Sequence, residues 1–255
     1  GSGSTAVSWT WKAGSAVSGN TSGSGTAKAY SGTTNATSKF SIIKWVGNGT
    51  SGQSIPHHLG SKPDMIWIKN LSRGTDWSCY QSAVGYSNSG NLGINITSGQ
   101  GAQAQFYTAE PTSTVFTVGN ATGVNVSDEN LIAYCWSNNA GYQKSGIYLG
   151  TGNAKGPFIY TGFKVQAVII KKYSGAANWT RFDTARDPYN VTQKVLLPDN
   201  SAAETDGSAK YLDLLSNGFV IKNDNGNFNT DEQKYLYLAF GQTIVGTNNI
   251  PANAR

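Results

Sequence analysis

Alternation of apolar and polar residues predicts short β-strands through most of the chain. Residues 7–11 alternate with a period of two, as expected of a strand with one buried face, and segments 40–45 and 147–149 follow the same pattern. Residues 65–68 and 167–170 are instead continuous apolar runs bracketed by turn residues. Such runs predict central strands that are covered on both faces.

Glycine-containing turns separate these strands, and helix signals are few. Residues 47–49 and 150–152 supply the positive φ that tight turns require. The segments 183–187 and 209–215 are the helix candidates, and each is long enough for one or two turns. Strand, turn and strand recur at intervals of roughly eight to twelve residues, which is typical of sandwiches and jelly rolls. The chain is therefore predicted to be all-β with very little helix.

The sequence repeats itself at a spacing of about one hundred residues. Lys62–Lys69 is followed 102 residues later by Lys164–Lys171, and Trp77 is followed at the same spacing by Trp179. A third apolar motif occurs at residues 7–11, 132–136 and 236–240. A repeat of this length indicates duplicated domains or half-domains rather than a short-period solenoid. We therefore predict two tandem β-sandwich units of jelly-roll or concanavalin-lectin-like type.

These spacings divide the chain into three predicted parts. Residues 39–142 form the first repeat, and residues 143–255 form the second repeat with a C-terminal tail. Residues 1–38 hold a strand that matches the end of a preceding repeat, followed by a Gly/Ser/Thr-rich linker or surface loop. Because a closing motif stands at the start, the chain is expected to be the C-terminal end of a longer protein.

Composition excludes several functional classes. Only 13% of the residues are charged, and the net charge of +5 is spread without a basic run, so nucleic acid is not an expected partner. No stretch of eighteen apolar residues exists, which argues against membrane insertion. Cys79 and Cys135 have no cysteine counterparts in the second repeat, so free buried thiols are favoured over a disulfide.

Aromatic residues are the first candidate binding groups, because their flat faces stack on sugar rings. Trp77 and Trp179 recur in register with the strand pattern, as core residues do. Trp45 lies beside a glycine turn and has Tyr148 as its counterpart in the second repeat. Trp45 and Tyr148 are therefore the predicted exposed platform.

The most charged segment of the chain is a second candidate. Asp183 and Asp187 are four residues apart and can act as a general acid and base, or bind Ca²⁺ together with Asn190. Arg181 and Arg186 favour a third interpretation, in which Arg–Asp pairs fix an exposed turn. All five residues are candidate ligand contacts.

The adjacent histidines offer little chemistry. His57 and His58 follow Pro56, and neighbouring side chains on an extended chain point to opposite faces. A structural turn is favoured, and no metal site is predicted. No Ser-His-Asp arrangement, dinucleotide motif or phosphate-binding loop is present, which argues against an enzyme.

Five further segments stand out as a set: Trp45–Gly49, His58–Lys69, Gly156–Phe163, Phe182–Asn190 and Ile250–Arg255. Together they resemble a repeat domain of tail-fibre and tail-associated proteins of bacteriophages, many of them marine. The resemblance extends from Val7 to Arg255 and departs at Lys164-Val165, where the first repeat has Lys62-Pro63. It implies a β-sandwich at the host-facing end of a virion appendage, acting outside the host cell. It also implies other virion tail proteins as partners. Phage fibres are commonly trimeric, which favours a homotrimer, but the sequence shows no coiled coil. The family brings no known catalytic residues, and no cofactor is expected apart from the Ca²⁺ considered above.

The sequence thus favours a non-enzymatic receptor-binding module that contacts a host cell-surface glycan or protein. One alternative is a purely structural virion protein, such as a head decoration or a tail spacer. Another is a glycan depolymerase that uses Asp183 and Asp187. A binder is expected to expose aromatic and amide side chains, whereas a spacer is expected to bury its aromatic residues at subunit contacts.

Overall fold

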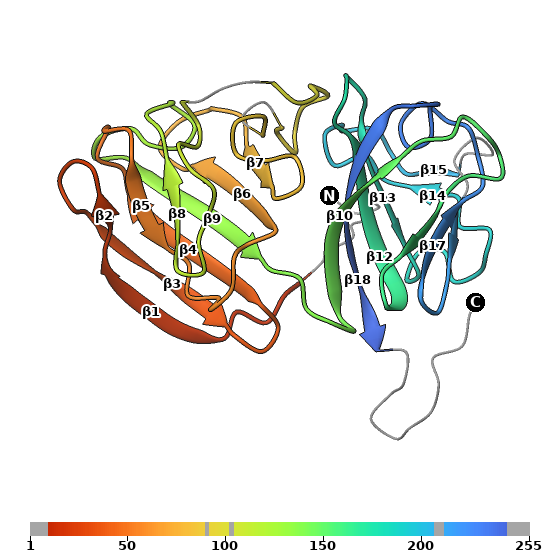
Figure 1. The fold of residues 1–255 in the computed structure, drawn as a ribbon, viewed down its shortest axis with the longest axis horizontal. Helices are drawn as coiled ribbons and strands as arrows, with labels where there is room; N and C mark the ends of the chain where they lie inside the picture. The colour runs from red at the N-terminus through yellow and green to blue at the C-terminus, as the bar shows by residue number, and fades with distance from the viewer. Residues whose placement is uncertain (1–9, 90–91, 102–104, 207–211, 244–255) are drawn as a thin grey trace, which may run out of the picture.

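The structure, a computed structural model, describes residues 10–89, 92–101, 105–206 and 212–243. These residues form antiparallel sheets and contain no helix, which confirms the predicted all-β class. Figure 1 shows two groups of strands side by side, the first half in red to yellow-green and the second half in green to blue. The first half contains β1 to β9, and the second contains β10 to β18.

Each half contains one large antiparallel sheet. The first sheet has the order β1-β3-β4-β9-β6-β7, and the second has the order β10-β18-β12-β13. The strands of the first are β1 (Ser15–Asn20), β3 (Ala29–Asn35), β4 (Phe40–Val46), β9 (Asn130–Trp136), β6 (Met65–Asn70) and β7 (Ser78–Gln81). The strands of the second are β10 (Gln143–Leu149), β18 (Lys234–Thr243), β12 (Phe163–Lys172) and β13 (Trp179–Asp183).

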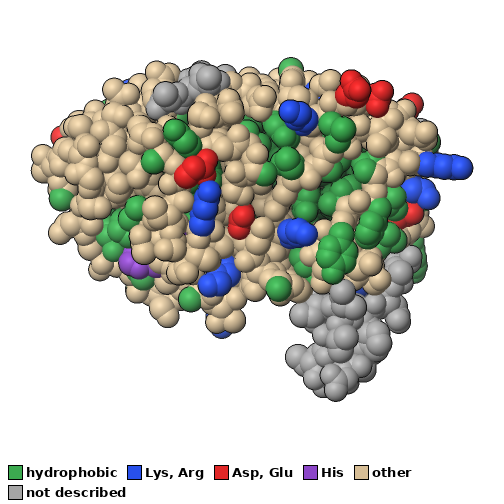
Figure 2. Space-filling model, in the orientation of Figure 1, with side chains coloured by type: hydrophobic (Ala, Val, Ile, Leu, Met, Phe, Trp, Pro, Cys, Tyr) green, Lys and Arg blue, Asp and Glu red, His purple; other side chains and the backbone are tan. Residues whose placement is uncertain are grey.

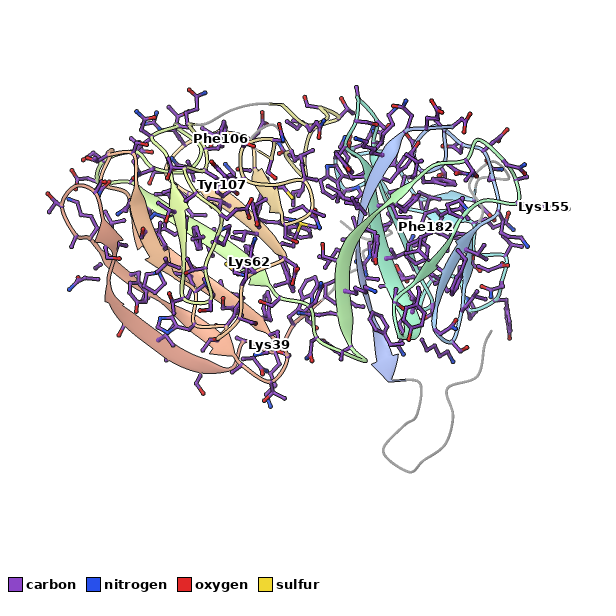
Figure 3. All side chains as sticks on the ribbon, viewed as in Figure 1. Lys39, Lys62, Phe106, Tyr107, Lys155 and Phe182 are labelled. Carbon is purple, nitrogen blue, oxygen red and sulfur yellow. The ribbon has the colours of Figure 1, made fainter. Side chains whose placement is uncertain are left out.

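A smaller sheet packs on one face of each large sheet and completes a sandwich. In the first half it contains β2 (Ser22–Gly23), β5 (Gln53–Pro56) and β8 (Val115–Val118). In the second half it contains β11 (Phe158–Tyr160), β17 (Gly218–Ile221) and β16 (Leu212–Leu214), and β14 (Lys194–Val195) pairs separately with β15 (Thr205–Asp206). Tyr107 lies inside the first sandwich and Phe182 inside the second (Figure 3).

The strand order of the second large sheet reproduces four strands of the first. β10, β18, β12 and β13 occupy the places of β4, β9, β6 and β7. The register agrees as well: Trp67 of β6 pairs with Tyr134, and Ile169 of β12, 102 residues later, pairs with Leu238. The spacing found in the sequence therefore recurs in the order and the pairing of the strands.

The two large sheets pack face to face and form a third apolar core, called the central core below. Met65 and Trp136 of the first half lie in one cluster with Trp179 and Leu238 of the second. A hydrogen bond also joins the halves, because Trp179 Nε1 donates to the Gly93 carbonyl at 2.8 Å. The central strands are consequently covered on both faces, as the continuous apolar runs predict.

The Gly/Ser/Thr-rich segment predicted as a linker or surface loop is instead folded into strands. β1 pairs with β3, β3 pairs with β4, and β2 pairs with β5. Gly32 lies so close to the Ile42 carbonyl that a Cβ atom there would be 2.0 Å from the oxygen. Backbone hydrogen bonds between strands, rather than burial of apolar side chains, hold this segment in place. The polar composition that predicted a linker gives no information about such backbone hydrogen bonds.

Three local predictions also differ from the structure. The helix candidate 183–187 is the last residue of β13 followed by a turn. Residues 7–9 of the predicted N-terminal strand lie outside the described residues, and Trp11 is in no strand but packs against Trp136 and Phe240 in the central core. Of the helix candidate 209–215, residues 209–211 lie outside the description and Leu212–Leu214 form β16. The apolar residues of that short segment contact the second sandwich core, which a strand allows.

The central core gives a stability prediction. Trp179 is fully buried, whereas its counterpart Trp77 is half-buried, with its ring 6.0 Å from that of Tyr134. Trp179→Ala should lower the free energy of unfolding by about 3–5 kcal/mol, because it leaves a large cavity. Trp77→Ala, the matched control, should cost less than about 2 kcal/mol. Chemical denaturation measures both, and equal losses would contradict the difference in burial.

Candidate binding surface

The predicted aromatic platform does not form. Trp45 is 1% exposed and packs edge-on against Phe116, with ring centroids 5.7 Å apart, inside the first sandwich. Tyr148 stacks on Tyr235 at 5.1 Å and donates its hydroxyl to the Phe228 carbonyl at 2.7 Å. Both positions face the small sheet of their own half. The prediction of Trp45 and Tyr148 as exposed ligand contacts is therefore wrong.

The Arg–Asp interpretation of the charged segment is confirmed. Asp183 is buried and accepts hydrogen bonds from Arg186 Nε at 2.8 Å and from the Arg186 backbone N–H at 3.0 Å. Arg181 Nε lies 3.5 Å from the same carboxylate, and Arg186 also binds Glu204 at 2.7 Å. Burial lowers the pKa of Arg181 to about 9, although the nearby Asp183 opposes the shift. These ion pairs stabilise the loop that follows β13.

Asp187 and Asn190 close the same loop onto the backbone. Asp187 Oδ2 accepts from the N–H groups of Gln193 and Lys194 at 2.8 and 3.3 Å. The Asn190 amide donates to the Leu214 carbonyl at 3.1 Å and accepts from the Leu214 N–H at 3.0 Å. Both oxygens of Asp183, Oδ2 of Asp187 and Oδ1 of Asn190 thus accept hydrogen bonds from protein donors. Within the described ranges, no cluster of three His, Cys, Asp or Glu side chains is placed to hold a metal ion.

The two histidines form a structural turn, as predicted. His57 is buried, its Nδ1 accepts from the Leu59 N–H at 3.2 Å, and its Nε2 donates to the Thr112 carbonyl at 3.3 Å. These partners require the neutral ring protonated on Nε2. Burial lowers the pKa of His57 to about 4. His58 points the other way and shares a hydrogen bond of 2.9 Å with the Tyr30 hydroxyl.

Two buried asparagines that the sequence did not single out hold the glycine turns. Asn125 Oδ1 accepts from the N–H groups of Asn48 and Gly49 at 2.9 and 3.1 Å. Asn229 Oδ1 accepts from the Thr151 N–H at 2.8 Å in the second half. The two asparagines are 104 residues apart, close to the spacing of the sequence repeat. Their recurrence in both repeats is the feature of the sequence that would have identified them. Their role is structural.

Exposed aromatic side chains gather on the second half instead. Phe158 and Tyr160 are 50% and 57% exposed and project from the same face of β11, while Ile159 between them enters the core. Lys144 Nζ lies 5.4 Å from the centroid of the Tyr160 ring and donates to the Tyr160 carbonyl at 3.0 Å. Figure 2 shows hydrophobic side chains gathered over the strands of this half. We call Phe158, Tyr160 and Lys144 the aromatic surface.

A depression lies on the first half. It is a shallow groove of about 520 Å³ across β1, β3 and β4, where the first large sheet is wider than the second. Its lining is mostly apolar, with a few hydroxyl groups and one ammonium group. The lining side chains include Ser18, Ser31, Thr33, Ile42 and Lys44.

Comparison with known proteins places the chain in a family. A family model described as "Domain of unknown function (DUF7483)" matches residues 1–243. The chain belongs to this family. No curated protein and no solved structure matches it. In the part of this DUF7483 domain that is described, no helix has the length and hydropathy to cross a membrane.

The cysteines of this DUF7483 domain are buried free thiols, as predicted. Cys79 Sγ lies 3.3 Å from Met65 Sδ in the central core. Burial raises the pKa of Cys135 to about 12 and raises that of Cys79 further. Neither thiol is therefore set up as a nucleophile.

The burial of His57 predicts acid sensitivity. Its pKa is about 4 in the folded protein and about 6.5 in an unfolded chain, so the unfolded state binds the proton first as the pH falls. The folded protein should lose about 3 kcal/mol of stability between pH 6.5 and 4 from this residue. Urea denaturation across that range measures the loss. A His57→Gln variant should lack this component, and an unchanged pH profile in the variant would contradict the assignment.

Proposed function

We propose that this DUF7483 domain is a non-catalytic binding module that holds a neutral glycan against its aromatic surface. The observation that carries the proposal is the exposure of two rings, Phe158 and Tyr160, on one face of a single strand. Large rings exposed together on a soluble surface mark interaction sites. Ring faces with a nearby polar donor suit sugars, which present both C–H faces and hydroxyl groups.

The aromatic surface is rigidly presented. β11 pairs with β17 through Phe158, Ile159 and Tyr160, and Ile159 is anchored in the sandwich core. Residues two apart on a strand are about 6–7 Å apart, so the two rings form a continuous strip. Lys144 fixes one end of the strip through the Tyr160 carbonyl. A pre-organised surface loses little side-chain freedom on binding, which favours even weak ligands.

The charged loop supports a binding role over a catalytic one. A depolymerase would need one carboxyl group to donate a proton to the glycosidic oxygen and another to act on the sugar or a water molecule. Asp183 is buried against Arg186, and Asp187 binds two backbone N–H groups. Both carboxylates are therefore engaged in holding their own loop.

The setting that we propose is the host-facing end of a phage tail appendage, outside the host cell. The sequence resemblance supports this setting, and the ligand is then a host cell-surface glycan. A virion presents many copies of each tail protein, so weak contacts at single domains combine into strong attachment. Neighbouring tail proteins are the other partners of the domain in this proposal.

A structural spacer is the second candidate, and one observation favours it. Trp45, Trp136 and Trp179 are all buried in cores of the domain rather than exposed at loop tips. A spacer would not be expected to expose Phe158 and Tyr160, however, unless another protein covers them. Binding measurements on the isolated domain separate these two functions.

The aromatic surface makes the binding proposal testable. A glycan array should identify a ligand, and calorimetry should give a dissociation constant between about 1 mM and 1 µM. Phe158→Ala and Tyr160→Ala should each weaken binding about tenfold, or about 1.4 kcal/mol, through the loss of one stacking contact. Tyr189→Ala removes an exposed ring elsewhere and should leave binding unchanged. Equal effects of all three variants, or no ligand on the array, would count against the aromatic surface.

The same proposal predicts weak dependence on salt. Lys144 is the single charged residue of the aromatic surface, and the proposed ligand is neutral. The dissociation constant should therefore change less than about twofold between low and physiological ionic strength, where screening of exposed charges becomes strong. Calorimetry in two buffers that differ only in sodium chloride measures this. A steep loss of affinity would indicate an anionic receptor.

A further inference from the structure

The two halves differ at one edge of their large sheets. In the first half, β4 is flanked by β9 on one side and by β3 on the other. In the second half, β10 takes the place of β4 and pairs with β18 alone, so it is the edge strand (Figure 1). The reason lies in the sequence: residues 14–35 precede β4 and form its neighbours, whereas only residues 137–142 separate β9 from β10.

The hydrogen-bonding directions along β10 follow from one bond. The Tyr142 carbonyl accepts from the Gly241 N–H, so even-numbered residues of this segment direct their backbone groups toward β18. In an antiparallel pair these directions alternate, so Gln143, Ser145, Ile147 and Leu149 direct their N–H and C=O groups outward. The open edge therefore consists of these four residues.

Two of these four residues, Gln143 and Ser145, already have hydrogen-bond partners for their outward backbone groups within the chain. Gln143 exchanges two backbone hydrogen bonds with Asn139, both at 3.0 Å. The Asn138 side chain imitates a neighbouring strand, because its Oδ1 accepts from the Ser145 N–H at 2.6 Å and its Nδ2 donates to the Ser145 carbonyl at 3.3 Å. The outward groups of Ile147 and Leu149 have no such partner among the described residues.

The remaining edge has the character of an association site. Ile147 and Leu149 are 44% and 53% exposed, and their side chains lie on the same face of the sheet. Soluble proteins protect edge strands with charged residues, proline or bulges, and Ser145–Leu149 contains none of these. An apolar edge with unpaired backbone groups is a template for another strand.

We propose that β10 pairs antiparallel with β10 of a second copy of this chain, about a two-fold axis at Tyr148. In this register Ile147 lies opposite Leu149 of the second copy, and the two pairs exchange four backbone hydrogen bonds. A register centred on Ile147 would instead place Leu149 opposite Ser145, whose outward groups already bind Asn138. The Asn138 contact thus selects the register.

A second copy suits this edge better than an unrelated protein. Two-fold antiparallel pairing presents the same segment on both sides, so an apolar residue always meets an apolar residue. The paired face is short, so the dimer belongs to the weak class of interfaces that bury less than about 1,200 Å². The inference does not rest on the proposed function: Lys144 is the one residue of β10 in the aromatic surface, and its side chain lies on the opposite face of the strand from Ile147 and Leu149.

Sedimentation velocity of the whole chain over a concentration series tests the pairing. The wild-type chain should shift from monomer to dimer as its concentration rises. A double variant, Ile147→Lys with Leu149→Lys, places like charges directly opposite each other and should weaken dimerisation at least tenfold. A second double variant, Ile147→Lys with Leu149→Glu, places opposite charges across the axis twice and should recover most of the dimer.

Leu71→Lys is the matched control, since Leu71 is exposed in a turn far along the chain from β10, and it should dimerise like the wild type. Circular dichroism confirms that each variant is folded. A wild-type chain that stays monomeric at its highest soluble concentration would overturn the proposal. A dimer that survives the lysine pair would do the same, because it must use another surface. Equal behaviour of the two double variants would overturn the proposed register.

Discussion

The packing of the two large sheets against each other is the constraint on which the other features depend. It buries both faces of the central strands, so a charged group in that layer needs a partner inside the protein. Lys171 shows the consequence: its ammonium group binds the Thr97 carbonyl at 2.7 Å and the Ala177 carbonyl, and burial lowers its pKa to about 8. Its counterpart Lys69 binds the Thr75 carbonyl in the same way within the first half. With the inner faces occupied, ligands and partners can reach only outer faces and strand edges.

Much of this fold is visible in the sequence because the determining patterns are local or repeated. Continuous apolar runs at residues 65–68 and 167–170 correctly predict doubly covered strands, and the Lys69/Lys171 spacing reappears as strand register. For the segment from Gly14 to Ser38 the same reasoning gave a wrong prediction, a linker or surface loop. Its strands are held by backbone hydrogen bonds on a sheet edge, where little apolar area is buried, so its hydropathy resembles that of a linker.

The candidate site was less predictable from the sequence, because tertiary packing decides which side chains are exposed. Phe158, Ile159 and Tyr160 are all apolar or aromatic, so alternation does not indicate which of them enters the core. The pairing of β11 with β17 decides it. The prediction for Trp45 was wrong for a related reason, because Phe116, which packs against it, lies on β8, far along the chain. The Asp183–Arg186 pair was accessible because its two residues are three apart and their charges alone indicate the contact. An ion pair between residues close in the sequence can thus be predicted from the sequence alone. Which face of a strand is buried cannot be predicted in this way.

The position of β18 has a mechanical consequence. This strand runs between β10 and β12 and is hydrogen-bonded to both along most of its length. Tension applied at Thr243 along the strand would load the two ladders in shear, so many hydrogen bonds would have to break together rather than one after another. Trp11, near the other end of the described chain, is wedged against Phe40 and Phe240 beside the same strand. Force along β18 would therefore be resisted by the two ladders at the middle of the second large sheet.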